Sequence, residues 1–218
     1  VNNEKDGLWL SYYFNGMMKD SIFYEAGYPE SRMAWHSNGY VSDSSVYHKD
    51  GNAEHRYWFD NGQLSHYGNS FGGKKEGDWR YFHKNGKRAA VETYSRDESM
   101  SRIYYDETGT QLASDVSKDR AAGFKGGTKK WRSYLHNNMD FLDGVKLVNT
   151  FFVTVVVAVT IDEEGKITDA YAEVPVSPAF DKQAIKVLEK SPQWLPAIDH
   201  NRFVKSYYRQ AITFGQID

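Results

Sequence analysis

The chain has 218 residues, of which 40% are hydrophobic and 16% aromatic, and this is enough apolar material for one large or two modest folded domains. Lysine and arginine number 27 against 29 aspartate and glutamate residues, so the net charge of −2 gives no reason to expect a nucleic acid or an anionic membrane as the main partner. The chain contains no cysteine, which excludes disulfide bonds, thiol catalysis and zinc sites with cysteine ligands.

Residues 1–115 carry a repeat whose most regular mark is a glycine. The repeated glycines follow one another at intervals of 23, 23, 24 and 23 residues and are Gly16, Gly39, Gly62, Gly86 and Gly109. An aromatic residue stands four positions before each of them, in turn Tyr12, Trp35, Trp58, Phe82 and Tyr105. Asparagine directly precedes every one of these glycines except Gly109. An Asn-Gly pair after an aromatic strand predicts a tight hairpin in which both turn residues accept positive φ.

Further turn signals between these glycines, such as Asp50-Gly51 and Gly72-Gly73, divide each period into two short strands. Two strands and two turns in each period predict a β-solenoid of stacked hairpins that forms one elongated sheet. We expect the repeated aromatic residues to fill its interior. Four aromatic residues outside the repeated positions are candidates for an exposed aromatic surface: Tyr28, Tyr40, Tyr47 and Tyr67.

This repeat resembles MORN-type repeats, and more closely the variant form of bacterial proteins with a Tyr-Tyr-x-x-Asn-Gly core. The resemblance covers residues 1–115 and implies a scaffold or a binding surface without naming a ligand. Thr108 replaces asparagine before Gly109, which suggests a terminal capping unit.

Residues 116–128 show no sustained period and include the pair Gly126-Gly127, so we predict a linker and a domain boundary here. A helix is expected directly after it, because Trp131, Tyr134 and Leu135 fall on one face at helical spacing.

Residues 129–218 are predicted to form a small α+β domain. The apolar, β-branched run 151–161 indicates a core strand, and the turn 162–165 leads into a second strand over 166–174. Ser177-Pro178 marks the start of an amphipathic helix that ends before Pro192. The last strand is expected over 204–214.

The same residues resemble the C-terminal domain of TonB-like proteins. The resemblance covers residues 129–216 and rests on the apolar strand, an Asp-x-x-Gly-Lys-Ile turn, a Phe-Asp-x-x-Ala-Ile-x-Val-Leu helix, Trp194-x-Pro196-Ala197 and a strand ending Ile212-Thr213-Phe214. It implies a non-enzymatic module of the Gram-negative cell envelope that binds a protein or peptide by adding a strand at a sheet edge. The residues expected at that edge are Tyr207, Tyr208, Arg209 and Gln210.

No arrangement typical of catalysis or cofactor binding stands out. The histidines are scattered, none pairs with another at the helical spacing of zinc ligands, and neither glycine pair lies between a strand and a helix as in phosphate-binding loops. We therefore expect no enzyme, no cofactor and no metal site.

Two functions stay open at this stage. The first is a periplasmic or cell-envelope protein, connected with transport, in which the repeats present a TonB-like protein-binding domain. The alternative is a surface protein that binds cell-wall glycan or another carbohydrate on the aromatic face of its repeats. The chain opens with Val1 and shows no export signal or membrane span, so we expect that an export signal has been removed.

Overall fold

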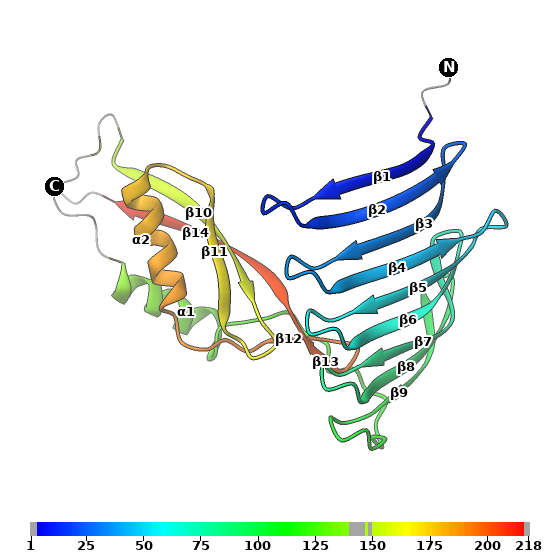
Figure 1. Ribbon diagram of the computed structural model, residues 1–218. Coiled ribbons are helices and arrows are strands. Elements are labelled where there is room, and N and C mark those ends of the chain that lie inside the picture. Colours follow the sequence, from blue (N-terminus) through cyan, green and yellow to red (C-terminus); the bar gives the residue numbers. More distant parts are fainter. Residues whose placement is uncertain (1–3, 140–146, 148–149, 216–218) are drawn as a thin grey trace. The chain divides into compact units, whose positions relative to one another are not determined.

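The computed structural model describes residues 4–139, 147 and 150–215. The chain divides into two compact units, the first formed by residues 1–117 with 200–202 and the second by residues 118–199 with 203–218. The first unit holds a nine-stranded sheet and the second holds a three-stranded sheet with two helices. The chain is therefore rich in β-structure, with a small α+β region at its C-terminal end (Figure 1).

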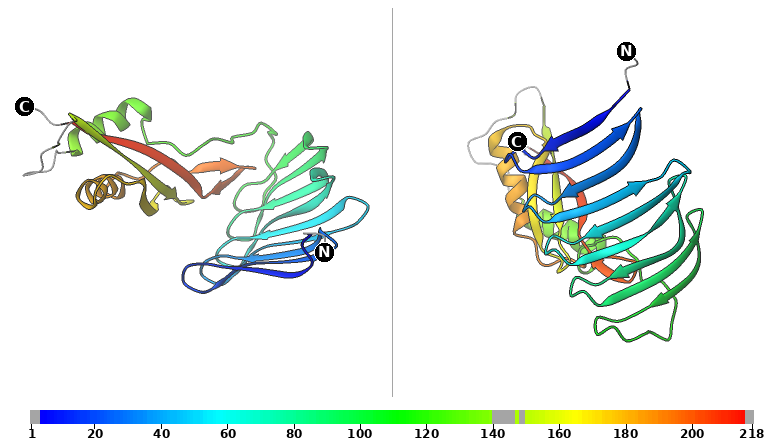
Figure 2. Two further views of the ribbon diagram at one scale, coloured as in Figure 1. Left: turned by 90° about the horizontal axis from the view of Figure 1, so that it is seen from above. Right: turned by 45° about the vertical axis from the view of Figure 1, so that its right-hand side comes forward.

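The sheet of the first unit is an antiparallel meander in which each strand pairs with the next along the chain. Its strands are β1 (Gly7–Tyr12), β2 (Met18–Glu25), β3 (Tyr28–Trp35), β4 (Val41–Tyr47), β5 (Asn52–Trp58), β6 (Leu64–Phe71), β7 (Lys74–Phe82), β8 (Arg88–Ser95) and β9 (Glu98–Tyr104). Figures 1 and 2 show that these strands form a single layer. The hairpins thus join edge to edge instead of winding into a closed coil.

The repeated Asn-Gly pairs occupy the turns at one end of this sheet, but they do not form the expected two-residue turns. In the first turn the Gly16 amide donates to the Tyr13 carbonyl and the Tyr13 amide donates to the Met17 carbonyl, so the loop is longer. Gly16 has a φ of 81°, whereas Asn15 is not among the residues with positive φ. Asn15 instead accepts the Met17 amide through its side-chain oxygen, at 3.1 Å.

Three of the asparagines also tie their turn to the next one. Asn38 Nδ2 donates to the Asp60 carbonyl at 2.7 Å, and Asn61 and Asn85 repeat the contact in the two following periods, at 3.2 and 2.9 Å. These contacts explain the spacing of 23 or 24 residues, because each turn must lie directly beside its equivalent in the next hairpin.

The prediction that the repeated aromatic residues fill an interior is wrong. None of these five residues is buried, and Tyr12 is 56% exposed. Their rings lie outside the packed core of the sheet, on a surface that is partly open to solvent. In three of the repeats the residue after the aromatic contacts the next repeat instead. The Tyr13 hydroxyl donates to the Trp35 carbonyl at 2.7 Å, His36 Nε2 lies 2.9 Å from the Trp58 carbonyl, and His83 Nε2 lies 3.1 Å from the Tyr105 carbonyl.

A hydrophobic core cluster of the first unit lies over β7, β8 and β9, where Trp79, Tyr81, Ala90, Tyr94 and Tyr104 pack together. Three residues from far along the chain, His200 to Arg202, belong to the same unit. The His200 ring stacks on Tyr81 with 3.8 Å between centroids. These three residues complete a core that the repeat alone does not cover.

The helices and strands after residue 118 are α1 (Gly127–Asn138), β10 (Phe152–Ile161), β11 (Ile167–Val174), α2 (Pro178–Glu189), β12 (Ala197–Asp199), β13 (Arg202–Val204) and β14 (Ser206–Gly215). All of them belong to the second unit except Arg202, the first residue of β13, which belongs to the first unit. The three-stranded sheet of the second unit has the order β11-β10-β14, and all its pairs are antiparallel. The buried face of α2 consists of Phe180, Ala184, Val187 and Leu188, and α2 packs on β10 and β11. The strands and helix predicted over residues 151–214 lie close to the expected positions.

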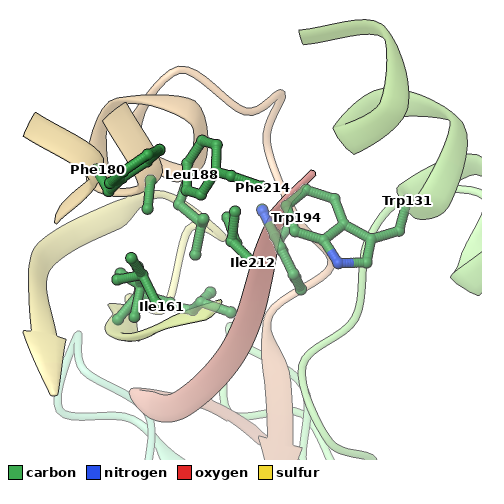
Figure 3. Close-up of a cluster of buried hydrophobic side chains, with 11 residues drawn as sticks. Trp131, Ile161, Phe180, Leu188, Trp194, Ile212 and Phe214 are labelled. Carbon is green, nitrogen blue, oxygen red and sulfur yellow. The ribbon is translucent and has the colours of Figure 1, made fainter. Parts of the chain in front are cut away.

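The hydrophobic core of this unit is formed by side chains from one face of the sheet and from both helices, which pack together (Figure 3). Trp194 is buried there, and its ring lies 4.9 Å from Trp131 of α1 and 4.8 Å from Tyr208 of β14, measured between centroids. The Trp194 indole donates to the Ser191 hydroxyl at 2.9 Å, so its polar atom is satisfied inside the core.

Part of the predicted linker 116–128 is ordered structure of the second unit. Arg120 exchanges backbone hydrogen bonds of 2.9 Å with Ile198, and Gly123 pairs in the same way with Leu195. The Phe124 ring lies 5.0 Å from that of Trp131. In the described part of the chain, neither helix is long and apolar enough to cross a bilayer.

Candidate functional site

One face of the nine-stranded sheet carries a hollow, which follows from the register of its strands. Tyr47 pairs with Ala53, and Ala53 pairs with Ser70, so these side chains form one row across β4, β5 and β6. Ala53 and Ser70 are both small and buried. Small residues between larger neighbours leave space above the backbone, and this row therefore forms the floor of a groove.

We call this hollow the tyrosine groove. It has a volume of about 930 Å³ and lies at the end of the sheet where β2 turns into β3, β4 into β5 and β6 into β7. The residues that line it are Glu25, Ala26, Tyr28, Pro29, Glu30, Tyr47, His48, Lys49, Gly51, Asn52, Ala53, His55, Ser70, Gly72 and Gly73. A volume of this size lies in the range of small-molecule sites, about 300–1,000 Å³.

Two tyrosines, Tyr28 and Tyr47, line the groove. Tyr28 is 75% exposed, and Tyr47 is half-buried. The Tyr47 ring meets the His55 ring edge-on, with 6.0 Å between centroids and 76° between planes. In the groove, the Tyr28 ring is therefore open to solvent, whereas the Tyr47 ring packs against His55.

His55 is fixed at the inner wall by both of its ring nitrogens. Its Nδ1 lies 2.9 Å from the Ser45 hydroxyl and its Nε2 lies 2.8 Å from the Ser70 hydroxyl. Burial lowers the pKa of His55 below its usual value, and the nearby Asp43 carboxylate only partly opposes this shift. We therefore expect a neutral imidazole at neutral pH.

The charges at the rim largely compensate one another. Lys49 Nζ donates to the Glu25 carboxylate at 2.5 Å, and this hydrogen bond is the largest cause that lowers the pKa of Glu25 and raises that of Lys49. Glu30 lies near the same pair and lowers the pKa of Glu25 further. The pair is exposed and adds little to stability, so it is available to form other hydrogen bonds.

His55 also belongs to a stack of rings whose other members lie outside the groove lining and have a structural role. His66 lies 4.2 Å from Tyr57 and 5.5 Å from Tyr81 between centroids, and burial is the main reason that its pKa falls to about 2. Lys75 Nζ lies 4.9 Å from the centre of the Trp79 ring and donates to the Tyr81 hydroxyl at 2.8 Å. These groups satisfy one another and form the core side of the wall.

The four predicted surface aromatics do not form one surface. Tyr28 and Tyr47 line the groove. Tyr40 lies in the turn after β3, at the opposite end of the sheet, where its ring packs against Gly62. Tyr67 alternates with His66 and Gly68 and so lies on the other face, stacked on Phe82 with 6.0 Å between centroids.

A second candidate site is the free edge of β14. This strand pairs with β10 over its whole length, from Ser206 to Gly215. The sheet order β11-β10-β14 gives β14 no second neighbour among the described residues. Its outer row of backbone amides and carbonyls can therefore accept another strand.

The four residues predicted at this edge point to two different sides. Tyr207 is 89% exposed, and Arg209 pairs with Glu173 of β11 on the exposed face. Tyr208 packs on Trp194, and Gln210 Oε1 accepts the Trp131 indole proton at 2.7 Å. Tyr208 and Gln210 therefore hold β14 to the core, and only Tyr207 and Arg209 face outward.

The sequence could not identify the floor of the groove. Ala53 and Ser70 are unremarkable in the sequence, and they become important only because the register places them side by side. No three His, Asp or Glu side chains that line the described groove bring their ligand atoms within 4.8 Å of one another. No protein-family model matches this chain, and no curated protein matches it.

Proposed function

We propose that the chain is a non-enzymatic binding protein of the bacterial cell envelope, whose second unit captures an extended segment of a partner protein along β14. The observation that carries this proposal is the position of β14 at the edge of the sheet, with ten paired residues on one side. The resemblance of residues 129–216 to the C-terminal domain of TonB-like proteins supports the same mode of binding and a periplasmic location.

Strand addition uses main-chain hydrogen bonds for affinity and side chains for selectivity. β14 is suited to this because its inward side chains anchor it firmly: Ile212 and Phe214 are buried, and Gln210 is bonded to Trp131. The strand therefore does not have to be ordered when a partner arrives, which lowers the entropic cost of binding. Tyr207 offers an exposed ring beside the incoming strand.

Binding can be tested with a panel of ten-residue peptides that alternate Val or Ile with Thr or Lys. We expect a bound peptide to protect alternate amides of β14 from hydrogen exchange, while the amides of β11 at the other edge stay unchanged. The control is the same peptide with alternate N-methylated amides, which keeps its side chains but loses its donors. Equal binding of the methylated peptide, or protection at β11 and not at β14, would show that β14 is not the receiving edge.

A variant of an outward-facing side chain tests how much that face of β14 contributes to binding. Tyr207→Ala should weaken peptide binding modestly, about two- to tenfold, because it removes a side-chain contact and leaves the backbone edge intact. It should not change the stability of the unit by more than about 0.5 kcal/mol, because the side chain is 89% exposed.

A further inference from the structure

The tyrosine groove lies in the first unit and plays no part in strand addition at β14. Its floor strands β4, β5 and β6 are inner strands that pair on both sides. Their backbone groups are used within the sheet, so an extended peptide cannot bind here as a further strand. On this floor a ligand must be recognised by side chains and by shape.

The chemistry of the lining favours an uncharged ligand with both apolar and polar faces. Tyr28 and Tyr47 offer ring faces together with hydroxyl groups. Lys49 supplies donors and Glu25 and Glu30 supply acceptors, within one rim. Because Lys49 and Glu25 already pair with each other, the rim does not present the single sign of charge that attracts a strongly anionic or cationic ligand.

We propose that the tyrosine groove binds a neutral oligosaccharide. A sugar ring has a face of C–H groups that can pack on the exposed Tyr28 ring, and its hydroxyls both donate and accept hydrogen bonds, as the rim requires. The volume of about 930 Å³ leaves room for more than a single sugar unit.

The inner wall is already rigid, which favours binding of a weakly interacting ligand. His55 is held by two serine hydroxyls, and Tyr47 is held against His55. Less conformational entropy is lost when a ligand contacts groups that are already ordered. Tyr28 is the exposed exception, and we expect its ring to become ordered when a sugar covers it.

The test uses the full chain with two neutral probes, a trisaccharide of β-linked glucose and a trisaccharide of β-linked N-acetylglucosamine. Binding of each probe is measured by calorimetry and by NMR of the tyrosine rings. We expect at least one trisaccharide to bind, with an affinity that does not change between low and high salt. Tyr28→Ala and Tyr47→Ala should each weaken binding about tenfold or more. Tyr40→Ala is the matched control, because this exposed tyrosine lies at the other end of the sheet, and it should bind the sugar unchanged.

A charged probe provides the opposing outcome. If trilysine binds in the groove, loses affinity with salt and is weakened by Glu30→Gln, while neither trisaccharide binds, the groove is a cation site and the proposal is wrong. It is also wrong if neither trisaccharide binds at millimolar concentration, or if the Tyr28 and Tyr47 variants bind sugar as well as the unchanged chain. Failure here leaves strand addition at β14 untouched, because that binding is measured at other amides with other probes.

Discussion

Gly165 shows how a single residue can hold two parts of the second unit together. It lies in the turn between β10 and β11 with a φ of 81°, and its carbonyl accepts the Trp194 amide at 2.8 Å. A Cβ atom added there would lie 2.0 Å from the Trp194 carbonyl oxygen, which is backbone and cannot swing away. The turn and the segment after α2 approach each other this closely only because residue 165 is glycine.

We expect Gly165→Ala to destabilise the second unit by about 3 kcal/mol or more, because the clash adds to the strain of a left-handed alanine. Gly16→Ala is a matched control, because Gly16 has the same φ of 81° but nothing within 4 Å of an added Cβ. It should cost only about 1–2 kcal/mol in the first unit. Urea unfolding of both variants measures the difference, and equal losses would mean that the turn can move away from Trp194.

Glu92 is a buried carboxylate through which we expect the stability of the first unit to depend on pH. Its Oε1 lies 3.0 Å from His200 Nδ1, and the Tyr94 hydroxyl donates to its other oxygen. Burial by itself raises the pKa of Glu92, but the hydrogen bonds from His200 and Tyr94 outweigh it and hold the pKa below its usual 4.5. A carboxyl group with a lowered pKa stabilises the fold above the unfolded-state pKa, and this contribution is lost as the pH falls.

We therefore expect the free energy of unfolding of the first unit to decrease as the pH drops below about 4.5. Glu92→Gln should lower stability at pH 7 and make the acid limb of the curve shallower, because position 92 then takes up no proton on unfolding. Thermal unfolding between pH 3 and pH 7 measures both effects. If stability falls with decreasing pH as steeply in the variant as in the unchanged chain, the pH dependence comes from other carboxylates.

The residues of the candidate sites were only partly predictable from the sequence. Tyr28 and Tyr47 could be recognised as surface aromatics, but they could not be separated from Tyr40 and Tyr67, because the face and the end of a strand depend on register. At β14 the signal was present: buried Ile212 and Phe214 alternate in step with Tyr208 and Gln210, and this alternation places all four toward the core.

At the scale of elements, the repeat was predictable where local geometry determines it. The periodic glycines mark turns because each takes a positive φ, and the strands between them follow from the spacing. The choice between a closed coil and an open meander depends on which strand edges pair, and a period of 23 or 24 residues is compatible with both. The prediction for the repeated aromatic residues is wrong because the core of this sheet is formed by other positions, such as Trp79, Tyr81 and Tyr94.

In the second unit, the elements with strong local signals lie where the sequence placed them, as with the apolar strand β10 and the proline-started helix α2. The segment 116–128 was harder to interpret, because its order comes from backbone pairing of Arg120 and Gly123 with residues far along the chain. Pairing between distant backbone segments leaves little trace in composition.

At the scale of the whole molecule, the assignment of residues 200–202 to the first unit could not be foreseen. The sequence indicated only a polar turn there, and His200 and Asn201 indeed take the positive φ values of 50° and 59° that such a turn needs. The structure adds that this turn supplies core contacts to a sheet formed by residues about a hundred positions earlier: Asn201 Nδ2 donates to the carbonyls of Ala89 and Tyr105, at 3.2 and 2.8 Å. We therefore expect the stability of the repeat to depend on a segment outside residues 1–115.

Arg202 offers a direct test of this dependence in the full chain. Its side chain is buried, Nη1 donates to the Ser65 carbonyl at 2.7 Å and to the Ser65 hydroxyl at 2.8 Å, and the guanidinium carbon lies 5.1 Å from the centre of the Tyr81 ring. Arg202→Ala leaves the Ser65 carbonyl without this charged donor and should destabilise the first unit by about 2–3 kcal/mol. Amide exchange should then accelerate in β6, β7 and β8, while β10 and β11 exchange as before.

Phe203→Ala is the control, because Phe203 is 41% exposed and should leave both sheets unchanged. If Arg202→Ala accelerated exchange equally in β10, or had no effect on β6 to β8, residues 200–202 would not act as part of the first unit, and the repeat would be stable without them.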